Sequence, residues 1–145
     1  IATANIGNEY TATRQLDKAL LDRFTVIEMD LLTQEEEYGL LKYMFPTVEE
    51  KALENVSSIT SLTRAEALTE NPRISSGVST RTSVEIAGLL FDGFSLLESA
   101  DITIYPQYDS TGGVDSERTF VKQIVQKFVS DGTEEELFNE HDSDV

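Results

Sequence analysis

The chain has 145 residues, of which 27 are acidic and 11 basic, so its formal net charge is −16. A surface with this charge repels nucleic-acid phosphates unless basic residues cluster, and the sequence shows no such cluster. Cysteine is absent, which excludes disulfides, thiolate metal sites and cysteine nucleophiles. The sequence shows neither an apolar run of ~18 residues nor a secretory signal, so we expect a cytoplasmic protein without a membrane span.

The first part of the sequence predicts a strand, a loop, a helix and a second strand. Residues 1–4 form an apolar run that ends at Asn5, and Gly7 lies in the loop that follows. Apolar residues at helical spacing predict a short helix over residues 13–22. The β-branched run FTVIEM, residues 24–29, predicts the second strand. Two short strands do not form a stable sheet alone, so both are expected to need neighbouring strands.

The middle of the sequence is helical in character. Thr33 and Glu36 fit a capping box that opens a helix ending at Pro46. The next helix carries apolar residues at spacings of three and four, frays over residues 60–70 and ends before Pro72.

The last helices are predicted from their apolar content. The loop 74–77 precedes residues 78–100, which predict one centrally buried helix, and residues 103–113 predict an irregular connection. Asp115 and Ser116 offer caps for a final helix. This helix carries two apolar ridges, formed by Phe120, Ile124 and Phe128 and by Val121, Val125 and Val129.

These elements predict a mostly α fold with a small α/β remnant. The remnant spans residues 1–32, the helical part residues 33–130, and the boundary falls near Asp30 to Gln34. Residues 131–145 carry seven carboxylates and neither Lys nor Arg, which predicts a disordered acidic tail or, as the alternative, a docking tail for a basic partner. The sequence begins at Ile1, within a β-like apolar run, and not at a Met. We therefore expect it to be a piece of a longer protein.

Several kinds of site are excluded by residue content. His141 is the only histidine, so a Ser-His-Asp triad or a histidine zinc site is not expected. The runs Glu35–Glu37 and Glu134–Glu136 lack the alternating ligands and central glycine of a calcium loop, and they predict solvated faces. The phosphate loop GxxxxGK[ST] and an apolar strand ending in Asp-Glu are both absent, so no metal ligand is predicted within these residues.

Three polar positions attract attention. Asn5 ends an apolar strand, where its amide suits a phosphate oxygen or a water, although it also suits a simple turn. Arg23 ends the first predicted helix. A purely structural role for it is a favourable interaction of its positive charge with the helix C-terminus, together with an ion pair to Asp22 or Asp17. Arg81 lies in the first turn of a helix that Ser79 can cap. A positive side chain is unfavourable at this end of the helix dipole, so a nearby anion explains Arg81 better than helix stability does.

The stretch IATANIGNEYTATRQLDKALLDRFTVIEMD resembles the second half of the ATPase domain in MoxR-type AAA+ proteins, in the branch of CbbQ-, NorQ- and CobS-like proteins. The matching residues are Ala2 to Asn5 at the sensor 1 strand, Gly7, and Ala19 to Phe24 at the end of the finger helix. The resemblance implies that Asn5 is sensor 1 and positions the hydrolytic water. It also implies that Arg23 is an arginine finger acting on ATP held by the neighbouring subunit.

The run Gly77-Val78-Ser79-Thr80-Arg81 resembles the Ser-Pro-Arg start of the sensor 2 helix in the lid of this family. Thr80 stands where proline is usual, and Ser79 keeps the cap. The resemblance implies that Arg81 contacts the γ-phosphate of ATP. The implied fold is the C-terminal edge of a P-loop AAA+ α/β domain followed by a helical-bundle lid.

The resemblance implies ATP hydrolysis in a ring, usually a homohexamer, that remodels or activates a partner protein, sometimes one of von Willebrand A type. ATP and Mg²⁺ are the implied ligands, with the phosphate loop and the Mg²⁺ ligands upstream of residue 1, so these residues alone should be inactive. Neither nucleic acid nor membrane is an expected partner. The alternatives are a non-enzymatic acidic interaction module whose arginines are structural, and a degenerate AAA+ subunit that lends its arginine finger to an active partner.

Overall fold

The computed structural model describes residues 1, 3, 19 and 22–139, with side chains described up to residue 129. The chain divides into two units, Ile1–Leu31 and Leu32–Val145, which are called here the N-terminal unit and the helical unit. Each unit is described by itself. Asn5, most of the predicted helix over residues 13–22, and His141 lie outside the described residues.

In the N-terminal unit, a turn at residues 22–23 leads into an extended segment that joins no sheet among the described residues. The strand predicted over residues 24–29 is therefore not formed. A strand needs a hydrogen-bonded neighbour, and the described part of the chain contains none. The segment exposes a series of apolar side chains, namely Phe24, Val26, Ile27, Met29 and Leu31.

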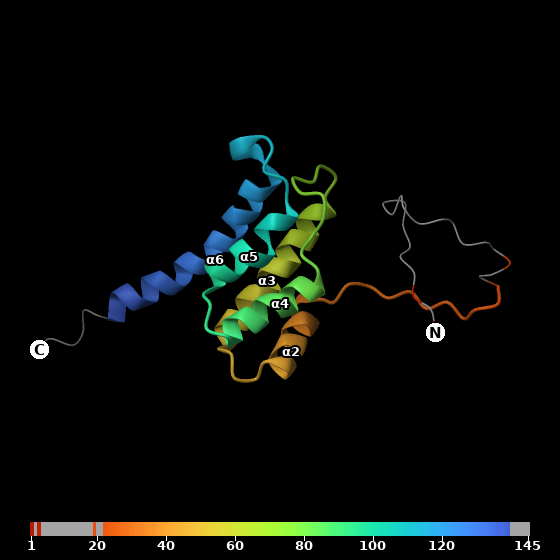
Figure 1. Cartoon of the computed structure of the whole chain (residues 1–145), viewed down its shortest axis with the longest axis horizontal. Helices are drawn as coiled ribbons and strands as arrows, with labels where there is room; N and C mark the ends of the chain where they lie inside the picture. The colour runs from red at the N-terminus through yellow and green to blue at the C-terminus, as the bar shows by residue number, and fades with distance from the viewer. Residues whose placement is uncertain (2, 4–18, 20–21, 140–145) are drawn as a thin grey trace, which may run out of the picture. The chain divides into compact units, whose positions relative to one another are not determined.

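The helical unit contains five α-helices within its described residues, which confirms the predicted helical bundle (Figure 1). The helix α3 packs against α2, α4 and α6, so it holds a central place among them. The bounds are α2 Gln34–Met44, α3 Glu50–Ala67, α4 Thr80–Phe91, α5 Leu96–Thr103 and α6 Glu117–Asn139, with 3₁₀ turns η1 Tyr105–Gln107 and η2 Gly113–Asp115.

The start of α2 confirms the predicted capping box. The Thr33 hydroxyl accepts the Glu36 N–H at 3.3 Å, and the Glu36 carboxylate accepts the Thr33 N–H at 2.9 Å. These bonds lower the pKa of Glu36, chiefly through the Thr33 backbone N–H. The helix ends at its C-cap Phe45, directly before Pro46, as the sequence predicts.

The helix α3 does not fray where the sequence predicts fraying. It continues without interruption to Ala67. The reason is that its last turns are buried against the rest of the unit: Thr60 and Thr63 are at most 1% exposed, and Arg64 is 8% exposed. These side chains are polar, so their burial does not appear in the apolar pattern of the sequence.

Residues 78–100 form two helices instead of the single predicted one. Gly93 takes φ +96°, and the N–H groups of Gly93 and Phe94 donate to the carbonyls of Leu90 and Leu89 at 3.1 and 3.0 Å. This pattern is a Schellman motif, which ends α4. A second capping box, between Ser95 and Glu98, then opens α5.

The core forms where the helices meet, and α6 contributes to it as its two ridges predict. Val121, Ile124 and Val125 are buried, and Phe120, Phe128 and Val129 pack against them. The Ser116 hydroxyl accepts the Thr119 N–H at 3.2 Å, so the predicted serine cap is present. The helix α6 extends to Asn139, into the segment that the sequence assigns to an acidic tail. Of the described helices, none is both long and apolar enough to cross a membrane.

The second capping box gives a test of the division between α4 and α5. We expect Ser95→Ala to lower the free energy of unfolding by about 1 kcal/mol, because the Glu98 N–H loses its side-chain acceptor. Ser61→Ala, in the middle of α3, is the control and should be neutral or slightly stabilising. Urea unfolding of both variants measures the difference. Equal stability of the two variants would contradict the division.

Candidate functional site at the start of helix α4

The structure describes two of the three predicted site residues, and they belong to different units. Asn5 lies outside the described residues. Arg23 lies in the N-terminal unit, in the turn at residues 22–23, and its side chain is exposed. Arg81 lies in the helical unit, in the first turn of α4, and it is also exposed. Whether the three residues form one site therefore stays a prediction.

Arg23 has no structural partner among the residues that the structure describes. It forms neither a hydrogen bond nor an ion pair with Asp22, which is the described one of its two predicted partners. The other, Asp17, lies outside the described residues. The guanidinium of Arg23 is thus presented to solvent within its own unit.

The start of α4 is capped as the sequence predicts. The Ser79 hydroxyl accepts the Thr82 N–H at 3.2 Å, and Ser79 has the extended backbone of an N-cap residue. The first turn of α4 contains no acidic residue, and Arg81 makes no ion pair with any described side chain. A cation at the positive end of a helix dipole is unfavourable, so helix stability does not account for an arginine at this position.

A buried ion pair between α2 and α3 contacts this turn. The guanidinium of Arg64 is 3.2 and 3.4 Å from the two carboxylate oxygens of Glu37. Glu37 is fully buried and Arg64 is 8% exposed. A bidentate pair of this kind fixes the relative orientation of both side chains, because two parallel N–H donors match two acceptors.

Two hydroxyls of α4 complete the coordination of this pair. The Thr80 hydroxyl donates to the Glu37 carboxylate at 3.0 Å and accepts from the Arg64 guanidinium at 3.1 Å. The Ser83 hydroxyl also donates to the Glu37 carboxylate. Both charges are therefore compensated by charge and by hydrogen bonds, which is the condition for burying an ion pair without a large penalty.

The loop before α4 is held to α3 by its backbone. The Val78 N–H donates to the Thr63 hydroxyl at 3.0 Å, and the Val78 carbonyl accepts from Arg64 Nε at 2.9 Å. Gly77 allows this close approach, since a Cβ at that position would lie 2.6 Å from the Arg64 Cα. Arg64 also donates to the Leu32 carbonyl at 3.0 Å, so it contacts the first residue of the helical unit as well.

The burial of Glu37 corrects one sequence prediction. The run Glu35–Glu37 was expected to be a solvated face, and Glu35 and Glu36 are exposed, but Glu37 is not. Glu37 lies one helical turn before the buried Leu41, so it faces the core. The signal available in the sequence was this spacing, together with an arginine on the following helix.

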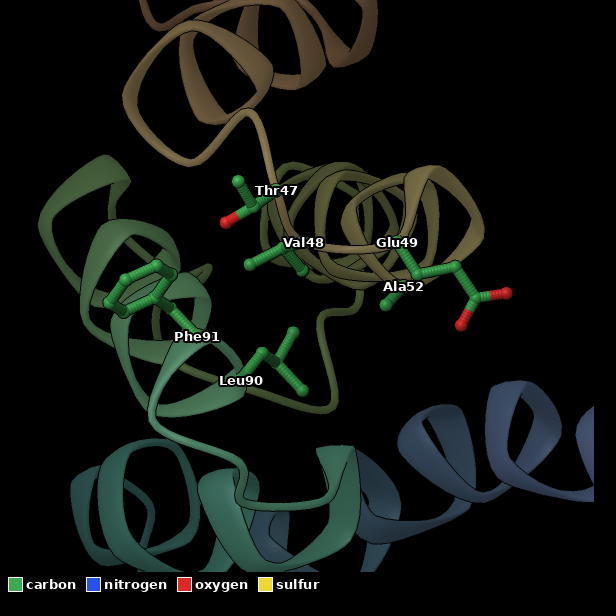
Figure 2. Close-up of a pocket in the computed structure, with 6 residues that line it drawn as sticks. All are labelled: Thr47, Val48, Glu49, Ala52, Leu90 and Phe91. Atoms are coloured by element: carbon green, nitrogen blue, oxygen red, sulfur yellow. The ribbon is translucent and has the colours of Figure 1, made fainter.

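A separate hollow of about 320 Å³ lies near the other end of α4 (Figure 2). It opens between the start of α3 and the end of α4, and the Glu49 carboxylate points away from it. The charged residue of its lining is Glu49, so charged side chains do not converge on this hollow. Its lining residues are Thr47, Val48, Glu49, Ala52, Leu90 and Phe91.

Metal chemistry has no support in the described part of the chain. Those residues contain no group of three or more His, Cys, Asp or Glu side chains that could hold a metal ion. The start of α4 is therefore the candidate site, with Arg81 as its exposed charged group and the Glu37–Arg64 pair as its support.

Comparison with known proteins gives one informative similarity. No family model matches the chain. Over 98 residues the chain is 36% identical to a protein of Thauera aromatica named "Putative chaperone BssE". The matched region covers 68% of this chain but only 32% of that protein, so the chain spans about a third of the length of this curated relative.

The close approach at Gly77 predicts a large effect of one added methyl group. Gly77→Ala should lower the free energy of unfolding by about 1–3 kcal/mol, because the loop must move away from Arg64. Gly39→Ala is the matched control: it lies in α2 with open space around it, and it should stabilise by about 0.5–1 kcal/mol. Thermal unfolding of both variants measures the contrast. A stabilised Gly77 variant would contradict the described loop.

The buried pair predicts a second contrast. Glu37→Gln keeps the side-chain shape but leaves the Arg64 charge without its counterion, and it should cost about 3–5 kcal/mol of stability. Glu35→Gln, two residues earlier and exposed, should stay within about 0.5 kcal/mol of the wild type. Urea unfolding curves decide between the two. Similar losses in both variants would show that Glu37 is not buried as a charge partner.

Proposed function

We propose that this chain is the C-terminal part of a MoxR-type AAA+ ATPase that couples ATP hydrolysis in a ring to the remodelling or activation of a partner protein. In this proposal, the N-terminal unit is the edge of the α/β ATPase domain and the helical unit is its lid. The observation that carries the proposal is the start of α4, where Arg81 is exposed and has no described partner, while the other polar side chains of residues 78–83 are hydrogen-bonded.

The similarity to a protein named as a chaperone supports the same direction. Protein remodelling is chaperone-type work, and the matched region covers most of this chain. The matched region covers only 32% of the relative, and the proposal places the phosphate loop upstream of residue 1 in the full-length protein. The exposed apolar residues of the N-terminal unit agree with a strand that pairs within a larger sheet, because such side chains need cover.

The proposed reaction is transfer of the ATP γ-phosphoryl group to water. Asn5 would orient the attacking water, Arg81 would contact the γ-phosphate from the lid, and Arg23 would stabilise the transition state in the active site of the neighbouring subunit. Mg²⁺ would neutralise phosphate charge, with its ligands upstream of residue 1. The exposed guanidinium of Arg23 suits this role, because a finger acting in trans has no partner in its own subunit.

The alternative of a non-enzymatic acidic module makes a different demand. There the arginines would be structural and would pair with carboxylates of their own subunit. Neither Arg23 nor Arg81 pairs with a described carboxylate, which favours the ATPase. A degenerate subunit lends Arg23 to a partner but does not hydrolyse ATP itself. The mixing experiments below distinguish it from an active subunit.

The test is carried out on the full-length protein. Arg23→Ala should leave ATP binding and the melting temperature unchanged but slow phosphate release by about 10³–10⁵-fold, as expected for loss of an arginine finger. Lys51→Ala, which removes another exposed cation, should have no effect.

Mixing experiments locate the finger. A subunit that lacks its phosphate-loop lysine but keeps Arg23 should restore turnover to the Arg23→Ala subunit. No recovery despite co-assembly would argue against action in trans. A wild-type protein that binds ATP but turns it over only with a second, active subunit would indicate the degenerate form.

A further inference from the structure

We infer that Thr80, held between Glu37 and Arg64, is a positioning residue that sets the direction of Arg81 toward a phosphate. This inference rests on the proposed function, because Arg81 is its proposed nucleotide contact. Thr80 itself touches no substrate in this account. It acts through the backbone of the first turn of α4.

The first step is the location of Thr80. It is the first residue of α4 and directly precedes Arg81. Its single hydroxyl bridges the two members of the buried pair, donating to Glu37 and accepting from Arg64. Its position is therefore set from both α2 and α3.

The second step is that the neighbours of Arg81 are held as well. Val78 is bonded to α3 through both of its backbone groups. Thr82 donates its N–H to Ser79, and its hydroxyl accepts from the Gln107 amide at 3.0 Å. Ser83 donates to Glu37. Among the polar side chains of residues 78–83, Arg81 is the one for which no hydrogen bond or ion pair is described, whereas Ser79, Thr80, Thr82 and Ser83 are all hydrogen-bonded.

The third step is physical. A group that must meet a phosphate binds more tightly when its backbone is already fixed in the productive direction, because less conformational freedom is lost on binding. A rigid helix start with one free guanidinium fits this requirement. Loss of the Thr80 hydroxyl should loosen the first turn and so weaken the interaction that Arg81 makes.

The experiment is a double-mutant cycle in the full-length protein. The KM for ATP and kcat are measured for Thr80→Val, Arg81→Ala and the double variant. We expect Thr80→Val alone to raise the KM by about 2- to 30-fold, the range seen when residues without ligand contact alter binding. In the Arg81→Ala background, Thr80→Val should cause no further rise. Thr80→Ser, which keeps the hydroxyl, should restore the wild-type KM.

The possible outcomes separate the inference from the proposed function. If Arg81→Ala raises the KM but Thr80→Val does not, or if the two effects multiply, the positioning role is overturned and the ATPase stands. If Arg81→Ala leaves the KM unchanged, the proposed role of Arg81 fails and the inference fails with it. Should Thr80→Val unfold at the assay temperature, Thr80→Ala removes the same hydroxyl at a position that suits alanine, and it replaces Thr80→Val in the same cycle.

Discussion

The buried ion pair between Glu37 and Arg64 is the interaction on which the helical unit depends. A buried pair contributes little net stability over well-packed apolar residues, because desolvation offsets much of the attraction between the charges. The pair also joins three helices, because its partners come from α2, α3 and α4. The pair thereby fixes the start of α4 and the loop at Val78.

The centre of this unit also contains buried polar residues. Thr60, Thr63 and Ser83 are buried, and each is hydrogen-bonded to a backbone or side-chain acceptor. Hydrophobic contacts are non-directional, whereas the bonds from Arg64 to Val78 and Thr80 each join a defined donor to a defined acceptor.

The sequence predicts those parts of the fold that have local causes. The cap at Thr33, the stop before Pro46 and the two ridges of α6 depend on neighbouring residues, and the structure contains all of them. The end of α4 also has a local signal, an Asp-Gly pair followed by Ser95 and Glu98, whereas the prediction of one helix over residues 78–100 rests on apolar content alone.

Other features could not be predicted because their causes lie far away in the sequence. Whether Glu37 is solvated depends on Arg64, and the extent of α3 depends on what covers Thr63. The segment 24–29 has a strand-like composition, yet no sheet forms without a partner strand. For the candidate site, the sequence identifies Arg81 and its serine cap, but it does not reveal the support beneath them.

The role of Thr80 is likewise clear only from its contacts with other helices. Ser79 has φ −80° and ψ 157°, the extended backbone that a following proline requires, so the helix start would accept proline at position 80. Backbone geometry therefore does not explain the threonine. The hydroxyl does, because it is the atom through which α4 meets both Glu37 and Arg64. Where a proline would fix only its own φ, the threonine fixes the turn relative to two other helices.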